Sequence, residues 1–345
     1  MKRLVLVSLA VCFLLSTLAG CARKEAPGPE KETVTIIDKT GRYVEVPRPV
    51  KRIVSLNSGM SALICAFGEG DKIVGRNCSS TFPSYLKEVF VVGKSSSHPN
   101  IELILEQKPD VVVTDPMLFE AEREKIEATG IPLIIDSTSD PDRLLPLIRN
   151  FGLILGKKEK AKEIIDYIEH SLSIVDERVE KLKLEGKPIP SVFFEFRNAY
   201  KSASAETVFH KPLVAAGGIN IAAGEPLGTP KLSSEWVFQR NPDIIIKRIS
   251  GDASVEEMKQ IREEIMSRPG LKEVKAVKEG KVYIIKADTF LTLRYPIGVL
   301  YYAKWFHPNL FQDIDPAAVH RELVEKFFGA EEWQKLTEAF AYPEP

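Results

Sequence analysis

The chain has 345 residues and a formal net charge of −1, because 47 Lys and Arg face 48 Asp and Glu. A sequence without a basic surplus argues against nucleic acid as a partner. The length exceeds what one hydrophobic core usually supports, so we expect two lobes.

The N-terminus is typical of an exported protein. Lys2 and Arg3 precede an uncharged stretch from Leu4 to Leu18, which at 15 residues is shorter than the ~20 of a membrane-spanning helix. We predict a signal peptide at residues 1–20; an uncleaved anchor is the alternative. Leu18-Ala-Gly-Cys21 resembles the lipobox of bacterial lipoproteins, which implies that Cys21 is lipidated. The polar, charge-rich segment 21–32 is then a lipidated, flexible tether.

The first lobe begins with expected strands at Val34–Ile37 and Tyr43–Val46. A further strand after Arg52 ends in Asn57-Ser58-Gly59, and an apolar helix follows at Met60–Phe67. A strand, a polar turn and a helix in this order are typical of a corner that faces a ligand. Asn57 and Ser58 are therefore predicted to contact a ligand.

One pattern occurs twice in the chain. Glu102 is followed after six residues by Pro109-Asp110 and the apolar run Val-Val-Val, and Glu235 by Pro242-Asp243 and Ile-Ile-Ile. The Pro stops a short helix, and an unbroken apolar run is typical of a parallel strand covered on both faces. Each copy thus predicts its own α/β layer, with a ligand between the two lobes at the carboxyl ends of the strands.

A long helical span is predicted from Asp142 onward, with a break at Gly156. Its apolar stripe and charged opposite face suit a strut between the lobes. The stripe consists of Ala161, Ile164, Ile165, Ile168, Leu172, Val175, Val179 and Leu182. The predicted boundaries are 33–141 for the N-terminal lobe, 142–186 for the connecting helix and 187–345 for the C-terminal lobe.

No catalytic signature is present in the sequence. The histidines show no paired metal-ligand spacing, but His98 and His210 fall in predicted loops near strand ends and stay open as metal ligands. The sequence leaves two states open for Cys65 and Cys78, a disulfide and two free thiols, since Cys65 lies in an apolar helical run that suits a buried thiol.

Several motifs in a fixed order identify a family by resemblance. They are the lipobox, RIVSLNSGMSALICAFGEGDKIVG, the duplicated E-x6-PD pattern, the long helix, AAGGINIA, and a late Arg loop before YYAKWFHPNLF. Together, over about Thr33–Phe328, they resemble the substrate-binding proteins of ABC importers for iron–siderophore, haem and cobalamin complexes. The resemblance implies an α/β fold of two lobes with central parallel sheets, joined by one rigid long helix, with the ligand cleft between them.

The resemblance also implies partners and roles. Glu102 and Glu235 match the two glutamates that dock on the ABC permease and its ATPase complex. The alternative for both is a helix-dipole role alone. The protein is expected to act without catalysis or cofactor, as a monomer, exported and held by its lipid on the membrane facing the periplasm or cell exterior.

The ligand is expected to be a ferric-siderophore-type metal chelate, because arginine suits anionic oxygens around a ferric ion. A corrinoid, haem or a nickel chelate is the alternative ligand within the class. In a more direct mode of binding, His98, His210 or Tyr295 completes the coordination of the metal. A two-lobed extracytoplasmic α/β enzyme and a structural adhesin are the alternatives from other classes. The predicted ligand-binding residues are Asn57, Ser58, Arg76, Phe82, Met117, Arg197, Tyr200, Arg294 and Tyr295.

Overall fold

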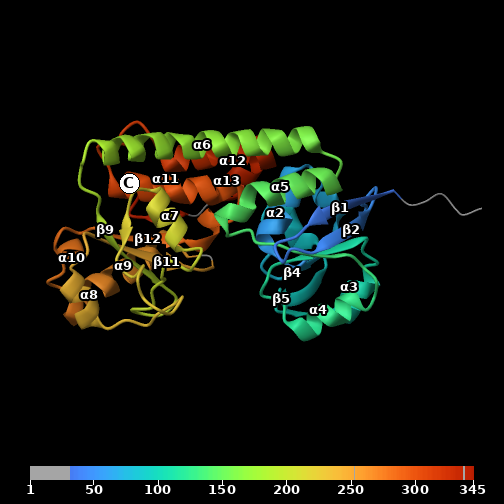
Figure 1. Cartoon of the computed structure of the whole chain (residues 1–345), viewed down its shortest axis with the longest axis horizontal. Coiled ribbons are helices and arrows are strands. Elements are labelled where there is room, and N and C mark those ends of the chain that lie inside the picture. The colour runs from blue at the N-terminus through green and yellow to red at the C-terminus, as the bar shows by residue number, and fades with distance from the viewer. Residues whose placement is uncertain (1–31, 252, 337–338) are drawn as a thin grey trace, which may run out of the picture. The chain divides into compact units, whose positions relative to one another are not determined.

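The first lobe is built on a six-stranded sheet with the strand order β6-β5-β4-β3-β7-β8 (Figure 1). Its strands are parallel except for β6, which pairs antiparallel with β5. The structure is a computed structural model that describes residues 32–251, 253–336 and 339–345, so the predicted signal peptide and Cys21 lie outside it. The strands are β3 Ile53–Ser55, β4 Ile73–Asn77, β5 Val91–Ser95, β6 His98–Pro99, β7 Val111–Thr114 and β8 Leu133–Ile135.

The second lobe contains a five-stranded sheet in the order β10-β9-β11-β12-β13. Its strands are parallel except for β13, which returns antiparallel to β12. Both sheets therefore confirm the predicted α/β class with central parallel strands. The strands are β9 Ser191–Phe196, β10 Ile219–Asn220, β11 Ile244–Ile249, β12 Val282–Lys286 and β13 Ala341–Tyr342, and a separate hairpin is formed by β1 Thr33–Ile37 and β2 Tyr43–Pro47.

The duplicated sequence pattern forms the same local structure in both lobes. In each copy a short helix precedes the Pro-Asp pair, and the strand that follows begins with four buried residues. The Asp carboxylate then accepts backbone N–H bonds at the start of the neighbouring strand. Asp110 accepts from Lys51 (2.7 Å) and Arg52 (2.8 Å), and Asp243 accepts from Ser191 (2.8 Å). The pattern thus fixes the pairing of two central strands in each lobe.

The predicted strut consists of two helices, α5 Pro141–Ile154 and α6 Lys158–Leu184. Between them Gly156 adopts φ +69°, a left-handed conformation that suits a residue without Cβ. Seven of the eight predicted stripe residues on α6 are buried and Leu172 is partly buried against the core. Figure 1 shows α6 running along both lobes.

The other helices cover the sheets or run beside α6. In the part of the chain that the structure describes, no helix combines the length and the apolar character needed to cross a membrane. The longer ones are α2 Ser58–Ala66, α3 Ile101–Glu106, α4 Glu120–Glu127, α7 His210–Ala215, α8 Ser234–Arg240, α9 Val255–Ser267, α10 Lys275–Lys278, α11 Tyr295–Phe306, α12 Pro316–Phe328 and α13 Ala330–Lys335. Short 3₁₀ turns lie at Gly70–Lys72, Ser84–Glu88, Pro269–Leu271, Ala287–Phe290 and Thr292–Arg294.

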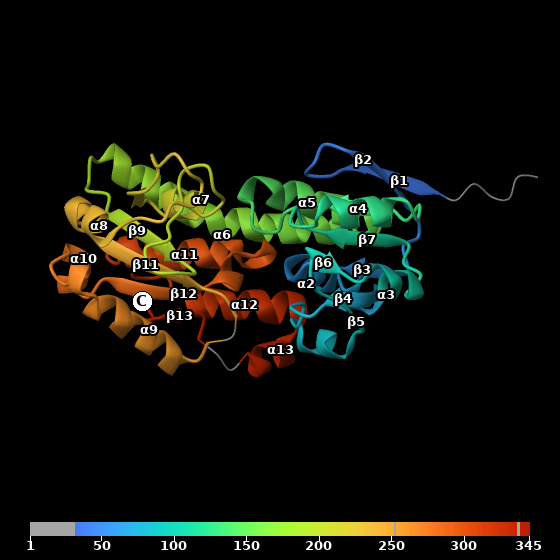
Figure 2. The same ribbon diagram turned by 90° about the horizontal axis from the view of Figure 1, so that it is seen from below.

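The C-terminal helices contact both lobes, whereas the sequence placed all of 187–345 in the second lobe. The Glu332 carboxylate on α13 accepts from the backbone N–H and the hydroxyl of Ser84 in the first lobe, at 2.6 and 2.7 Å. Phe328 at the end of α12 meets the Phe82 ring edge-on at 4.8 Å. Figure 2 shows α13 beside the first lobe. These side-chain contacts join distant segments and leave no periodic signal in the sequence.

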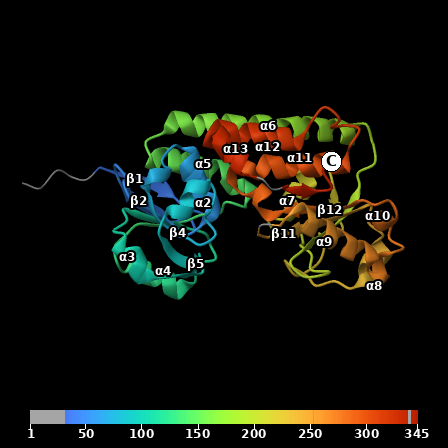
Figure 3. The ribbon, with the colours of Figure 1, turned by 180° about the vertical axis from the view of Figure 1, so that it is seen from behind.

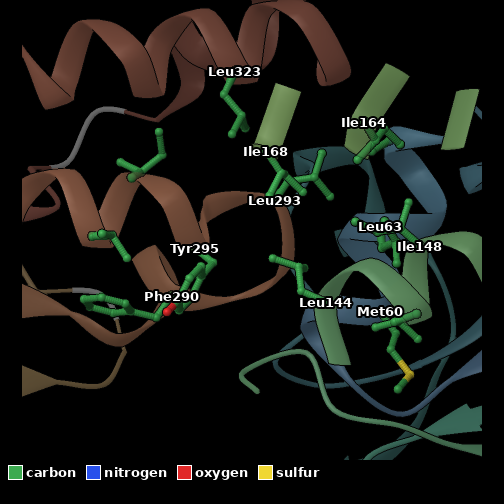
Figure 4. Packing of buried hydrophobic residues seen from close by; sticks show 14 of the residues in the cluster. Met60, Leu63, Leu144, Ile148, Ile164, Ile168, Phe290, Leu293, Tyr295 and Leu323 are labelled. Atoms are coloured by element: carbon green, nitrogen blue, oxygen red, sulfur yellow. The ribbon is translucent and has the colours of Figure 1, made fainter. Parts of the chain in front are cut away.

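One hydrophobic core runs from the first lobe through α5 and α6 into α11 and α12. Met60 and Leu63 of α2, Ile164 of α6 and Tyr295 of α11 belong to the same buried cluster (Figure 4). Residues 33–345 also form one compact unit. The lobes therefore share this large core, and each lobe also has a smaller buried cluster of its own beside its sheet.

We expect the folded body, residues 33–345, to unfold in one cooperative transition, because separating the lobes would expose the large buried cluster that spans both of them. The measurement is guanidinium denaturation followed by tryptophan fluorescence and by far-ultraviolet circular dichroism. Coincident curves are expected. Two resolved transitions would contradict the shared core.

Candidate ligand-binding site

A cavity of about 340 Å³ lies between the lobes, within the range of small-molecule sites. The first lobe contributes the start of α2, including Ser58 and Gly59, and the loop after β4, which carries Phe82. The second lobe contributes Ser250 and Gly251 after β11 and most of the segment 287–294 after β12. Both sides therefore come from the carboxyl ends of central strands, as the sequence predicts.

Arg294 is the buried cation of this cavity. Only 8% of the residue is exposed. Its guanidinium lies 4.1 Å from the centre of the Phe82 ring and 5.4 Å from that of Phe340. Its Nη1 donates to Asp288 at 3.2 Å, but Nε and Nη2 are buried without a hydrogen-bond partner. Burial lowers the pKa of Arg294, while the charge of Asp288 opposes that shift.

Two groups beside Arg294 leave its charge largely uncompensated. Asp288 is partly exposed, which weakens its attraction through solvent screening. His320 is fully buried, and its pKa is well below the ordinary value because of burial and the nearby Arg294 charge, so the ring is neutral. The charge of Arg294 is thus only weakly balanced by its neighbours, which suits an anionic ligand in the cavity that this residue lines.

A second cavity of about 170 Å³ shares Phe82, Asp288 and Arg294 with the first. Three lysines and one glutamate complete its charged lining: Lys87, Lys286, Lys335 and Glu332. Cationic side chains outnumber carboxylates around the pair of cavities. This balance favours an anionic ligand over a cationic one.

The loop that carries Arg294 belongs to the second lobe and is held by hydrogen bonds to the first. Thr292 has φ +46°, and its N–H donates to the Thr138 carbonyl at 2.8 Å. Its hydroxyl donates to the Gly59 carbonyl at 3.4 Å. Gly59 itself allows a close approach, because a Cβ there would lie 2.6 Å from Oγ1 of Thr138. The floor of the cavity is therefore fixed to α2 and to the segment before α5.

Asn57 shapes the corner beside the cavity, and Ser58 lines the cavity itself. The Asn57 side chain caps α2 by accepting from Met60 N–H at 3.0 Å, and it donates to Asp115 at 2.7 Å. Thr138 donates to the same Asn57 oxygen at 3.2 Å. Because these bonds occupy the amide, we assign Asn57 a positioning role.

Arg76 does not reach the cavity, which corrects its predicted placement. The side chain is buried and donates to four backbone carbonyls at 2.8 to 3.3 Å. A buried guanidinium requires such acceptors, and the surrounding loop supplies them. Position after a strand does not determine whether an arginine points into the cleft or back into its own loop.

Arg197 and Tyr200 also lie outside the cavity lining. Both have positive φ, +55° and +61°. The buried ion pair of Glu195 and Lys247 holds the loop, because the Lys247 ammonium also donates to the Arg197 carbonyl at 2.9 Å. Arg197 is exposed, and the Tyr200 ring stacks with the guanidinium of Arg268 at 5.3 Å. Their strained loop turns both side chains away from the cavity, so the three predicted arginines do not converge.

Tyr295 and Met117 are likewise absent from the lining. Tyr295 is buried and faces a separate cavity of about 10 Å³ together with Arg248. Met117 is 60% exposed on the loop after β7. Arg248, which the sequence reasoning missed, has an unpaired buried Nε and donates to the Ala287 carbonyl at 3.3 Å. The sequence feature that could have drawn attention to Arg248 is its position near the end of strand β11.

The two histidines held open as metal ligands lie apart from the cavity. His98 contacts Ser97 through Nδ1 at 3.0 Å and meets Phe119 edge-on. His210 pairs with the Asn220 amide at 3.3 Å in a different surface pocket. Within the described ranges, no three His, Cys, Asp or Glu side chains are grouped to hold a metal ion.

Both cysteines of the folded body are free thiols, Cys65 buried and Cys78 exposed. Burial raises the pKa of Cys65 to about 12, with the Tyr85 hydroxyl nearby. We expect a maleimide to label the folded body, starting at Ala22, once at Cys78 and to label Cys65 only after unfolding. Mass spectrometry without reductant measures both steps. Two protected sulfurs after unfolding would instead indicate a disulfide.

Glu102 and Glu235 are both exposed in the first turn of their helices. Asn100 caps the first of these helices by accepting from Leu103 N–H, and Ser233 caps the second by accepting from Trp236 N–H. Backbone and serine hydrogen bonds at the helix start lower the pKa of Glu235. The cap geometry accounts for the helix starts, and it leaves both carboxylates facing solvent.

Two α/β lobes, a helical connection and a cavity between the strand ends define a two-lobed binding protein. Residues 53–289 match the family described as periplasmic binding protein. Since this match spans more than half of the chain, the protein belongs to the periplasmic binding protein family.

Individual relatives agree with this assignment. The chain is 24% identical over 334 residues to the uncharacterized ABC transporter substrate-binding lipoprotein YvrC of Bacillus subtilis, covering 91% of this chain and all of the other. It is 27% identical to the iron-uptake system-binding protein of the same organism, covering 84% and 92%. The crystal structure of the TroA-like periplasmic binding protein FepB from Veillonella parvula shares the fold, with a TM-score of 0.71, 24% identity and coverage of 86% and 96%.

Proposed function

We propose that this protein is the extracytoplasmic substrate-binding component of an ABC importer. It captures a ferric-siderophore-type metal chelate in the cavity between its lobes and delivers the chelate to a permease and its ATPase. It catalyses no reaction. Support for the class comes from the family match and from relatives named as a transporter lipoprotein and an iron-uptake binding protein.

The observation that carries the ligand class is the buried guanidinium of Arg294, whose Nε and Nη2 have no acceptor. Its ion pair is with the partly exposed Asp288, so the buried charge favours a ligand that supplies anionic oxygens. Catecholate, hydroxamate and carboxylate oxygens around Fe³⁺ meet this need. The Phe82 ring packed on the guanidinium and Phe328 beside it give the chelate apolar surface to lie against.

The same proposal includes export and anchoring. The chain would be cleaved before Cys21, lipidated there, and held at the outer side of the membrane by the tether 21–32. A relative named as a lipoprotein, matched over 334 residues, supports this location.

Tryptophan fluorescence of the folded body tests the ligand class. Trp333 is a suitable reporter because it contacts His320, which lies beside Arg294. We would titrate ferric catecholate, ferric hydroxamate, haem, cobinamide and nickel–histidine, with the metal-free chelators as controls. Saturable sub-micromolar binding of a ferric chelate is expected. Tight binding of cobinamide alone would replace the anionic chelate with a corrinoid, and no binding by any ligand would contradict the proposal.

A further inference from the structure

Each of the two repeated glutamates has an exposed apolar neighbour at the same position. Leu105 follows Glu102 by three residues and is 40% exposed; Phe238 follows Glu235 by three residues and is 50% exposed. Residues three apart lie on the same face of a helix. The carboxylate and the apolar side chain therefore share one exposed face in each lobe.

The two faces are structurally equivalent. Both helices precede a Pro-Asp pair whose carboxylate fixes the adjacent central strand, so α3 and α8 occupy matching places in their lobes. Figures 1 and 3 show α3 and α8 on the side of the molecule away from α6. An equivalent surface in each lobe matches a partner with two equivalent sites.

Charge complementarity indicates the chemistry of that partner. Among the residues that the structure describes, Glu102 and Glu235 form no ion pair, although many exposed carboxylates elsewhere are paired. In each lobe a large exposed apolar side chain lies beside a carboxylate that has no ion pair. Such a surface is complementary to a partner that carries a cation next to an apolar recess.

We propose that Leu105 and Phe238 are the apolar anchors of a two-point docking surface for the importer's permease, each inserted beside a cation that pairs with Glu102 or Glu235. This inference rests on the proposed function and adds the residues that hold the complex together. The carboxylates steer the approach and give salt dependence, whereas the buried apolar anchors set the dissociation rate.

The test compares surface variants for binding to the ABC permease–ATPase complexes of the source organism, each in lipid nanodiscs, by interferometry at two salt concentrations. The variants are the pairs Leu105→Ser with Phe238→Ser and Glu102→Gln with Glu235→Gln. Leu184→Ser is the matched control, because Leu184 is 87% exposed and is the last residue of α6, the helix that lies on the side of the molecule away from α3 and α8.

We expect the apolar double variant to dissociate roughly ten to one hundred times faster than wild type with unchanged salt dependence. The Gln double variant should associate more slowly and lose much of the salt dependence. Leu184→Ser should match wild type, and thermal unfolding should show all variants folded. If the apolar double variant behaves like Leu184→Ser, the proposal of apolar anchors is wrong while the proposed function stands. Wild type that binds none of the complexes would overturn the proposed function together with them.

Discussion

Arg294→Met is expected to bind the ferric chelate far more weakly than wild type while its apo form unfolds at higher denaturant concentration. Removing one partner of a buried charged contact reduces binding by about 2–5 kcal/mol, or roughly 30-fold to several thousand-fold. In the apo protein the same substitution removes a buried cation whose Nε and Nη2 are unpaired. The substitution removes the burial cost of that cation, and the partly exposed Asp288 that remains keeps contact with water, so the apo protein should gain stability.

Fluorescence titration and guanidinium denaturation measure the two effects on the same samples. Arg197→Met is the matched control, because Arg197 is exposed and absent from the cavity lining. The control should change neither quantity. Equal losses of affinity in both variants would show that net charge, rather than the position of Arg294, determines binding.

Glu195→Gln is expected to destabilise the second lobe by about 3–5 kcal/mol. The buried Glu195 carboxylate accepts from Lys247 at 2.9 Å and from Arg268 at 2.7 Å, and it also accepts from the Tyr200 N–H at 2.6 Å. The neutral amide leaves the buried Lys247 without its countercharge and leaves Arg268 with only the exposed Glu264 as a partner. Denaturation at pH 7 measures the loss, and the double substitution Glu195→Leu with Lys247→Met should recover part of it.

The destabilisation should depend on pH with a defined sign. Burial alone would raise the pKa of Glu195, but the hydrogen bond with Arg268, the charges of Lys247 and Arg268 and the Tyr200 N–H together hold it below the ordinary value. Its contribution is therefore present above the unfolded pKa of about 4.3 and is lost as the pH falls through the lower folded value. The stability gap between wild type and Glu195→Gln should narrow below about pH 4. A gap that widens on acidification would contradict the assigned charge state.

The fold could be predicted because its determinants are local. The Pro-Asp pairs, the apolar strands that follow them and the stripe on α6 depend on residues close in sequence. The strands predicted at Val34–Ile37 and Tyr43–Val46 lie within one residue of these limits, at Thr33–Ile37 and Tyr43–Pro47. The contact of α13 with Ser84 joins residues 248 positions apart and has no local signature.

The site was less predictable, because the direction of an arginine depends on the acceptors around it. Arg76, Arg197 and Arg294 all flank strand ends, yet only Arg294 lines the cavity. The side chain of Arg76 is hydrogen-bonded to nearby backbone carbonyls, and the positive φ in the loop of Arg197 directs that side chain outward. Thr292 sets the direction of Arg294 through bonds to distant residues.

Anomalous diffraction at the iron edge, from crystals of the folded body grown with the ferric chelate that binds in the titration, tests the central claim most directly. We predict one iron peak in the cavity between Ser58 and Arg294, with chelate oxygens within hydrogen-bond distance of Nε and Nη2 of Arg294. An iron peak beside His98 or His210, or a chelate bound outside the cavity, would contradict the claim.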